Sequence, residues 1–115
     1  MAMKFGNFLD DPRLLAIQSQ VCKIMSNPRR VQILHLLDEK ERSVGELVEL
    51  TGLRKAAVSQ NLALMRARNL VTYRRDGQKV IYKIKSKNLL AACRAMETLL
   101  LELVELGPGD DSPVE

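Results

Sequence analysis

The sequence predicts a mainly helical domain that carries one β-hairpin, an α+β fold. Asp11-Pro12 and Asn27-Pro28 each pair a capping residue with a proline, and apolar residues at helical spacing follow both. Only the region around Asp76-Gly77 has the period of two that is typical of strands. The 115 residues suffice for one core, which must use Leu, Val, Ile, Met and Ala because aromatic residues make up 3% of the chain.

Two helices are expected at the start of the domain. The first covers residues 12 to about 25, and the second covers residues 28 to about 37. Arg29 and Arg30 lie in the first turn of the second helix, where the helix dipole disfavours cations. A nearby phosphate would compensate for this, although an exposed pair of arginines is compatible with the same pattern.

A charged turn at Asp38–Arg42 is expected to lead into two further helices. Ser43-Val44-Gly45-Glu46 has the form of a capping box, with the hydroxyl residue three positions before the glutamate. The helix that it opens is expected to end near Thr51-Gly52, because glycine readily adopts the left-handed conformation that follows a helix. The next helix covers roughly Arg54–Ala67, and its apolar stripe is formed by Val58, Leu62 and Met65.

The hairpin and a last helix complete the domain. Val71–Arg75 and Lys79–Ile84 are rich in strand-forming residues and flank Asp76-Gly77-Gln78, which is a strong turn signal. Ser86 is expected to cap a helix over residues 87 to about 106. We therefore expect an N-terminal arm (1–9) that contains Phe5 and Phe8, a folded domain (10–106) and an acidic flexible tail (107–115).

The positive charge is concentrated in one part of the chain. The net charge is +4, but the segment from Arg54 to Lys87 contains ten basic residues and a single acidic one, Asp76. A field concentrated in this way attracts a polyanion to one region of the surface. A solvated basic face without a partner is the alternative interpretation.

The order of the elements predicts a winged helix-turn-helix that binds double-stranded DNA. Two short helices joined by a turn at Gly52 precede a basic hairpin, and the second helix of such a pair enters the major groove. Gln and Asn side chains can read adenine, Arg can read guanine, and basic hairpin residues suit phosphates or the minor groove. The expected DNA contacts are Arg29, Arg30, Ser43, Arg54, Lys55, Ala56, Ser59, Gln60, Asn61, Arg74, Arg75 and Lys79.

The sequence resembles the ArsR/SmtB family of winged-helix repressors from about residue 14 to residue 103. The resemblance rests on NPRRVQILHLL, SVGELVELTGL, AAVSQNLALMRARNLV and TYRRDGQKVIYKI, in that order and at those intervals. It implies four helices, a hairpin and a fifth helix, with a homodimer formed through the first and fifth helices. It also implies an inverted-repeat operator and release by a small inducer. Asn61 stands where most members have His after Ser-Gln, so base preference at that point is not carried over.

The residues that the family uses to sense metals are missing. The third helix lacks the Cys-x-Cys ligand pair, and in the last helix only Glu102 could ligate, so we expect no metal and no cofactor. Cys22 and Cys93 are the remaining sensor candidates, through a disulfide, a polysulfide bridge or a thiophilic ion such as arsenite. The sulfide- and redox-responsive branch instead has thiols at the positions of His35 and about Leu101. Cysteines that serve only as small buried apolar residues are the alternative.

Other function classes fit less well. One His, no Gly-rich phosphate loop and no Ser-His-Asp set argue against an enzyme. A winged helix used for protein interaction or RNA binding is a second class, and the basic hairpin and the polar second helix of the pair argue against it because a protein-binding hairpin would be less positive. Without a signal peptide or membrane span, we expect a cytoplasmic protein with no membrane partner.

Overall fold

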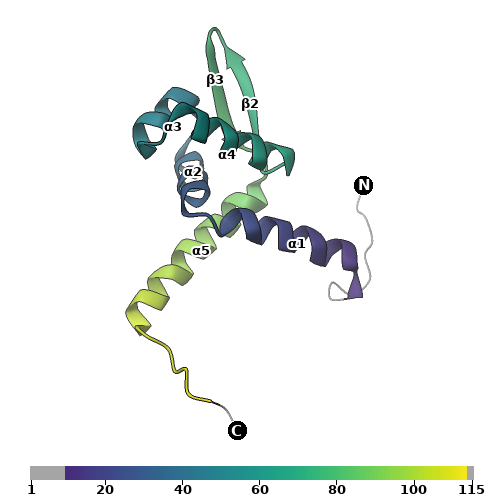
Figure 1. Ribbon diagram of the computed structural model, residues 1–115, viewed down its shortest axis with the longest axis vertical. Helices are drawn as coiled ribbons and strands as arrows, with labels where there is room; N and C mark the ends of the chain where they lie inside the picture. Colours follow the sequence, from purple (N-terminus) through teal and green to yellow (C-terminus); the bar gives the residue numbers. More distant parts are fainter. Residues whose placement is uncertain (1–9, 114–115) are drawn as a thin grey trace.

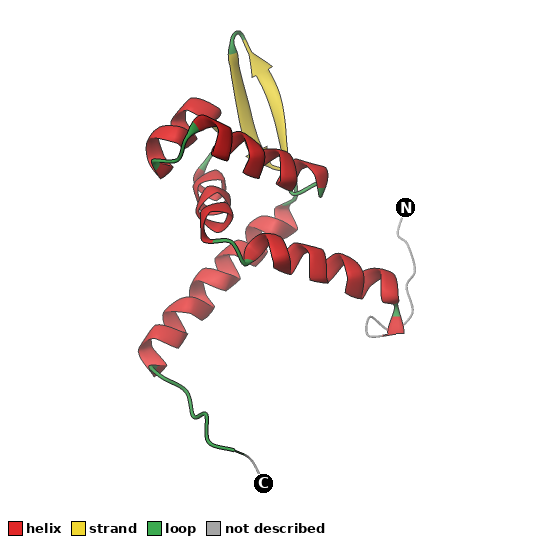
Figure 2. Ribbon diagram, viewed as in Figure 1, coloured by secondary structure: helices red, strands yellow, loops and turns green. Residues whose placement is uncertain are grey.

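The computed structural model describes residues 10–113 and contains five α-helices and a small antiparallel sheet (Figures 1 and 2). The sheet order is β1-β3-β2. Within residues 10–113 no helix has both the length and the hydropathy that crossing a membrane requires. The elements in chain order are α1 (Pro12–Met25), α2 (Pro28–Glu39), β1 (Arg42–Ser43), α3 (Val44–Thr51), α4 (Lys55–Ala67), β2 (Val71–Asp76), β3 (Lys79–Ile84) and α5 (Lys87–Leu106).

The helix starts lie where the capping signals predict them. The side chains of Asp11, Asn27 and Ser86 accept hydrogen bonds from backbone N–H groups in the first turns of α1, α2 and α5. Ser43 and Glu46 form both hydrogen bonds of the predicted capping box. At the other end of α3, Gly52 has a φ of 72°, the left-handed conformation expected of it.

The expectation of a charged turn at Asp38–Arg42 is wrong in part. α2 continues to Glu39, and Arg42–Ser43 pairs with Ile81 and Tyr82 of β3 as a third strand. Two residues are too few to show a strand period, so no local pattern predicts β1. The hairpin turn is also shorter than expected, because Asp76 belongs to β2 and pairs with Lys79. Gly77 has a φ of 62° and is the first residue of the remaining two-residue turn.

The core is centred on α2, which contacts α1, α3, α5 and β3. Ile33 and Leu34 of this helix are completely buried, as are Leu47 of α3 and Cys93 of α5. α1 and α5 extend beyond this core, and Figure 1 shows both projecting away from the sheet. Their projecting parts expose large apolar side chains, namely Leu15, Ile17, Met96, Leu99, Leu100, Leu101, Leu103, Val104 and Leu106.

The structure describes the C-terminal limit of the predicted domain but not the N-terminal arm. The predicted arm, including Phe5 and Phe8, lies outside the described residues. α5 ends at Leu106, and residues 107–113 are exposed and have no helix or strand. Gly107, the first residue of the predicted acidic tail, is the C-cap of α5.

Arg42 joins the end of α2 to the start of α3. Its Nε donates to the Leu36 carbonyl at 2.9 Å, and its Nη2 lies 3.2 Å from Glu39 Oε1. The side chain is only 12% exposed, and Nη1 lies 4.0 Å from Glu46 Oε2. It thus satisfies a carbonyl near the end of α2 that the helix leaves without a partner.

We expect Arg42→Ala to lower the free energy of unfolding by about 1–3 kcal/mol, because a charge-assisted bond to a shielded carbonyl is lost. Urea unfolding followed by circular dichroism measures this loss. Glu39→Gln is the matched control, since its side chain is 65% exposed, and it should cost less than about 0.5 kcal/mol. Equal losses in the two variants would contradict this role of Arg42.

Candidate nucleic-acid interface

The packing of α4 determines which of its side chains face solvent. Val58, Leu62 and Met65 recur at helical spacing and are completely buried against the core. The opposite side of α4 and its N-cap expose five of the residues expected at DNA. Lys55, Ala56, Ser59 and Gln60 are exposed there, as is Arg54 at the N-cap position.

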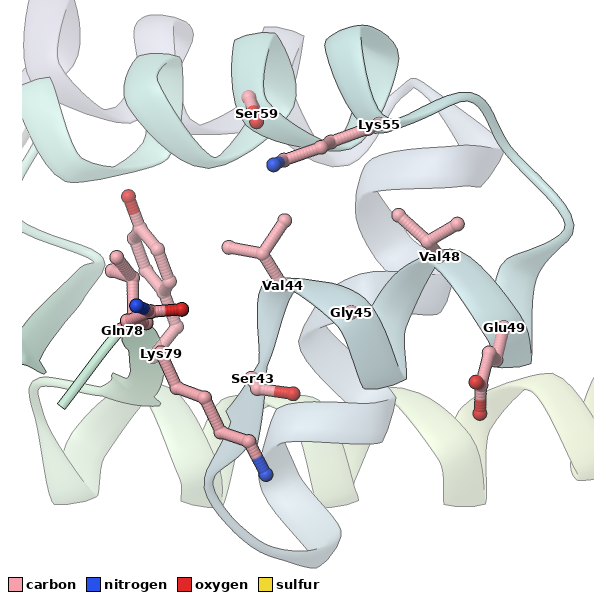
Figure 3. Close-up of a pocket in the computed structure, with 11 residues that line it drawn as sticks. Ser43, Val44, Gly45, Val48, Glu49, Lys55, Ser59, Gln78 and Lys79 are labelled. Carbon is pink, nitrogen blue, oxygen red and sulfur yellow. The ribbon is translucent and has the colours of Figure 1, made fainter. Parts of the chain in front are cut away.

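A groove of about 550 Å³ separates the starts of α3 and α4 from the hairpin (Figure 3). Val44 and Val48 of α3 contribute apolar walls. Lys55 and Ser59 border it from α4, and Lys79 borders it from β3. In Figure 3 the Lys55 side chain extends from the start of α4 across Val44 into this space. The groove therefore combines apolar walls with two lysines and one carboxylate, Glu49, at its border. The lysines suit a sugar–phosphate chain.

Ser43 lies at the same groove but is committed to the fold. Its side chain is largely buried, and its hydroxyl accepts a hydrogen bond from the Glu46 backbone N–H at 3.1 Å. The Ser43 N–H donates to Glu46 Oε1 at 3.2 Å, and this bond lowers the pKa of the Glu46 carboxyl. The structure accounts for Ser43 as a capping residue without any contact to DNA.

The strand register separates the basic residues of the hairpin. Arg75 pairs with Val80, and Tyr73 pairs with the buried Tyr82, so strand alternation sends Arg75 to the face that packs on the core. Arg74 points to the other face. The two arginines are adjacent in the sequence, but the pleat directs them to opposite sides of the hairpin.

Arg74 is neutralised by acidic neighbours. Its Nη2 lies 2.9 Å from Glu41 Oε1, and its Nη1 lies 3.8 Å from Asp76 Oδ2. The hydrogen bond from Arg74 lowers the pKa of Glu41 and raises the pKa of Arg74, as expected for a close ion pair. Within residues 10–113, Arg75 has no carboxylate within ion-pair distance. Arg75 is therefore the hairpin arginine whose charge is available to a ligand.

The base of the hairpin is braced by aromatic contacts that the sequence does not signal. The Arg66 guanidinium lies 5.0 Å from the Tyr73 ring centre, and the Tyr73 and Tyr82 rings are 5.5 Å apart. Cation–π and tilted ring contacts of this kind stabilise at this range. They fix the hairpin to the end of α4, so the two parts of the interface keep one relative orientation.

Asn61, which was expected to read a base, has two hydrogen-bond partners within the protein. Its Oδ1 accepts a hydrogen bond from Arg30 Nε at 3.1 Å, and its Nδ2 donates to the Ala57 carbonyl at 3.0 Å. Both ends of the amide are thus used within the protein. Arg29, the neighbour of Arg30, is exposed, and its Nη1 lies 3.5 Å from Gln32 Oε1 in its own helix.

The two cysteines have different surroundings. Cys22 is exposed on α1, and Cys93 is buried in the core where α5 meets α2. Burial raises the pKa of the Cys93 thiol, and the carboxylates of Asp38 and Glu97 raise it further. His35 lies in the same α2–α5 contact, with Nδ1 2.8 Å from Glu97 Oε1. In residues 10–113 no three His, Cys, Asp or Glu side chains are grouped so as to hold a metal ion.

Known proteins are similar to this chain in both sequence and fold. Residues 27–73 match the bacterial regulatory protein, arsR family. The transcriptional activator HlyU from Vibrio cholerae is 40% identical over 67% of this chain and 71% of its own length. A homodimeric winged helix-turn-helix DNA-binding domain from Mycobacterium bovis has a TM-score of 0.77 at 28% identity, over 96% of this chain and 99% of its own. The transcriptional repressor BigR from Xylella fastidiosa has a TM-score of 0.72 at 26% identity, over 82% of this chain and 96% of its own.

The resemblance seen in the sequence is confirmed, and the chain belongs to the ArsR family of winged helix-turn-helix transcriptional regulators.

Proposed function

We propose that the protein is a homodimeric repressor that binds an inverted-repeat operator and is released by a small inducer. The observation that carries this proposal is the exposed polar face of α4, together with the lysines that border the groove and with Arg75, which has no carboxylate at ion-pair distance among residues 10–113. An α-helix fits the major groove, and the hairpin then lies along the adjacent backbone. A regulator of this kind works in the cytoplasm, where bacterial DNA is found.

The exposed apolar side chains of α1 and α5 support the homodimer. Leu101, Val104 and Leu106 are 68%, 79% and 78% exposed, respectively. An apolar surface of this extent is unfavourable in water and is typical of an interaction site. A second copy of the chain covers it in the simplest way, and the similar Mycobacterium bovis domain is homodimeric. Two-fold symmetry of the protein then calls for an inverted repeat in the DNA.

Repression is the simpler of the two regulatory directions. A dimer that covers a promoter excludes polymerase without any further contact, whereas activation requires a surface that recruits polymerase. Similar proteins include both an activator, HlyU, and a repressor, BigR. We propose repression because DNA would cover the polar face of α4 and the hairpin, and a second subunit would cover the apolar side chains of α1 and α5.

Release through thiol chemistry at Cys22 and Cys93 has little support from their surroundings. A reactive cysteine needs access and a stabilised thiolate, but Cys93 has 0% exposure and a raised pKa. We therefore propose the alternative, in which Cys93 is a core residue and the inducer acts without a thiol pair.

Selection from a random duplex library, followed by binding measurements, tests the proposal. We expect the enriched duplexes to contain an inverted repeat and to bind a dimer far more tightly than a single half-site does. The affinity should fall steeply with salt, because cations displace counterions from phosphates. A flat salt response, or binding by monomers only, would sink the proposal.

Gln60→Ala tests the base-reading face of α4. We expect a loss of about 1–3 kcal/mol on the selected duplex and a relaxed preference at one base pair of each half-site. Ala63→Ser is the matched control, because residue 63 is also exposed but lies one turn further along α4. If Gln60→Ala weakens binding to all duplexes equally, Gln60 does not read a base.

Arg74→Ala and Arg75→Ala compare the two faces of the hairpin. Loss of Arg75 should reduce the slope of log affinity against log salt by about one unit, whatever the sequence of the duplex. Loss of Arg74 should change the slope little, because its charge is already matched by Glu41. Equal changes in the two variants would rule out this division of the hairpin.

Thiol labelling tests the assignment of Cys93. In the Cys22→Ser variant we expect Cys93 to react with an aromatic disulfide reagent about tenfold or more slowly in native protein than in urea. Oxidant, persulfide and arsenite should leave the DNA affinity of the wild-type protein unchanged. If one of them releases the wild type but not a Cys22→Ser, Cys93→Ala variant, thiol sensing is correct after all.

A further inference from the structure

We propose that Asn61 is a positioning residue, which holds the Arg30 guanidinium against a DNA phosphate and does not read a base. This inference rests on the proposed function, since it requires that α4 and the start of α2 face the same DNA. It gives α4 a second role besides base reading. The argument uses the contact between Arg30 and Asn61, which are 31 positions apart in the chain.

The Asn61 amide is held in one orientation. The Ala57 carbonyl requires the NH₂ group on its side, and Arg30 Nε, which is only a donor, requires the oxygen on the other side. In a flipped amide the NH₂ group would face the Arg30 Nε–H donor and the oxygen would face the Ala57 carbonyl, so both hydrogen bonds would be lost. Asn61 is also half-buried, so solvent does not easily replace either partner. The Asn61 oxygen is therefore a rigid support for whatever binds to it.

Arg30 has most of its donors left for another partner. A guanidinium has five N–H groups, and the bond to Asn61 uses only the one on Nε. Within residues 10–113 no carboxylate lies at ion-pair distance from Arg30. The remaining N–H groups form a planar fork, which matches two oxygens of a phosphate.

The start of α2 is itself suited to an anion. Asn27 Oδ1 accepts from the backbone N–H groups of Arg29 and Arg30, which fixes the first turn. Two cations then stand at the positive end of the helix dipole with no acid in the first turn. A phosphate relieves this repulsion, and the bond to Asn61 sets where along α4 that phosphate must lie. Base reading by Gln60 and backbone contact by Arg30 are thereby kept in one register.

A double-mutant cycle on DNA affinity tests the inference, with the full chain and a duplex obtained by selection. We expect Asn61→Ala to weaken binding about three- to tenfold on the selected duplex and on a scrambled duplex alike, the size of one hydrogen bond. The salt slope should fall by up to about one unit as Arg30 leaves its phosphate. Alanine suits a helix interior, so the variant folds, and urea unfolding verifies this.

Arg30→Lys provides the decisive comparison, because it keeps the charge and removes the Nε donor. In this background Asn61→Ala should have no further effect on affinity. Additive effects of the two changes, or a changed base preference of Asn61→Ala like that of Gln60→Ala, would overturn the positioning role. If the wild-type protein binds no selected duplex at all, the proposed function fails first, and that outcome is distinct from an additive cycle.

Discussion

The burial of Val58, Leu62 and Met65 is the constraint on which the interface depends. These three side chains fill the core side of α4 and leave the helix no freedom to rotate about its own axis. A rotation that exposed them would remove three apolar side chains from the interior, at about 1.5–3 kcal/mol each. The direction in which Ser59 and Gln60 point is therefore a result of core packing. A specific DNA contact needs such a rigid support.

The hairpin is oriented by the same core from another side. Tyr82 enters the core from β3, and strand alternation then fixes the direction of every other hairpin residue. Arg75 consequently lies on the face shared with Tyr73, while Arg74 is turned outward to Glu41. The charge of the hairpin is thus asymmetric. The Arg74 charge is matched by Glu41, whereas Arg75 on the opposite face has no carboxylate at ion-pair distance among residues 10–113.

Features set by neighbouring residues could be predicted from the sequence, and features set by distant ones could not. The caps at Asp11, Asn27, Ser43 and Ser86 and the left-handed Gly52 each depend on a few adjacent residues. β1 could not be predicted because its two residues become a strand only by pairing with β3, some forty positions later.

The same distinction applies to the candidate site. Helical periodicity correctly indicated which face of α4 is exposed. The partners of Asn61 and Arg74 lie 31 and 33 positions away, so no local pattern reveals that these side chains are already occupied. Composition likewise identified Cys93 as a candidate sensor, but only the packing of α5 against α2 shows its burial.

Because α1 and α5 expose apolar side chains, the stability of the protein is expected to depend on its concentration. A chain whose last helix exposes Leu101 and Val104 gains stability whenever association covers them. In such a system the melting temperature rises with protein concentration. A melting temperature is therefore defined only together with the concentration at which it was measured. DNA that binds two copies at adjacent half-sites raises their local concentration in turn. For a protein that acts as proposed, the amount in the cell contributes to DNA occupancy twice, once through association of the subunits and once through binding to DNA.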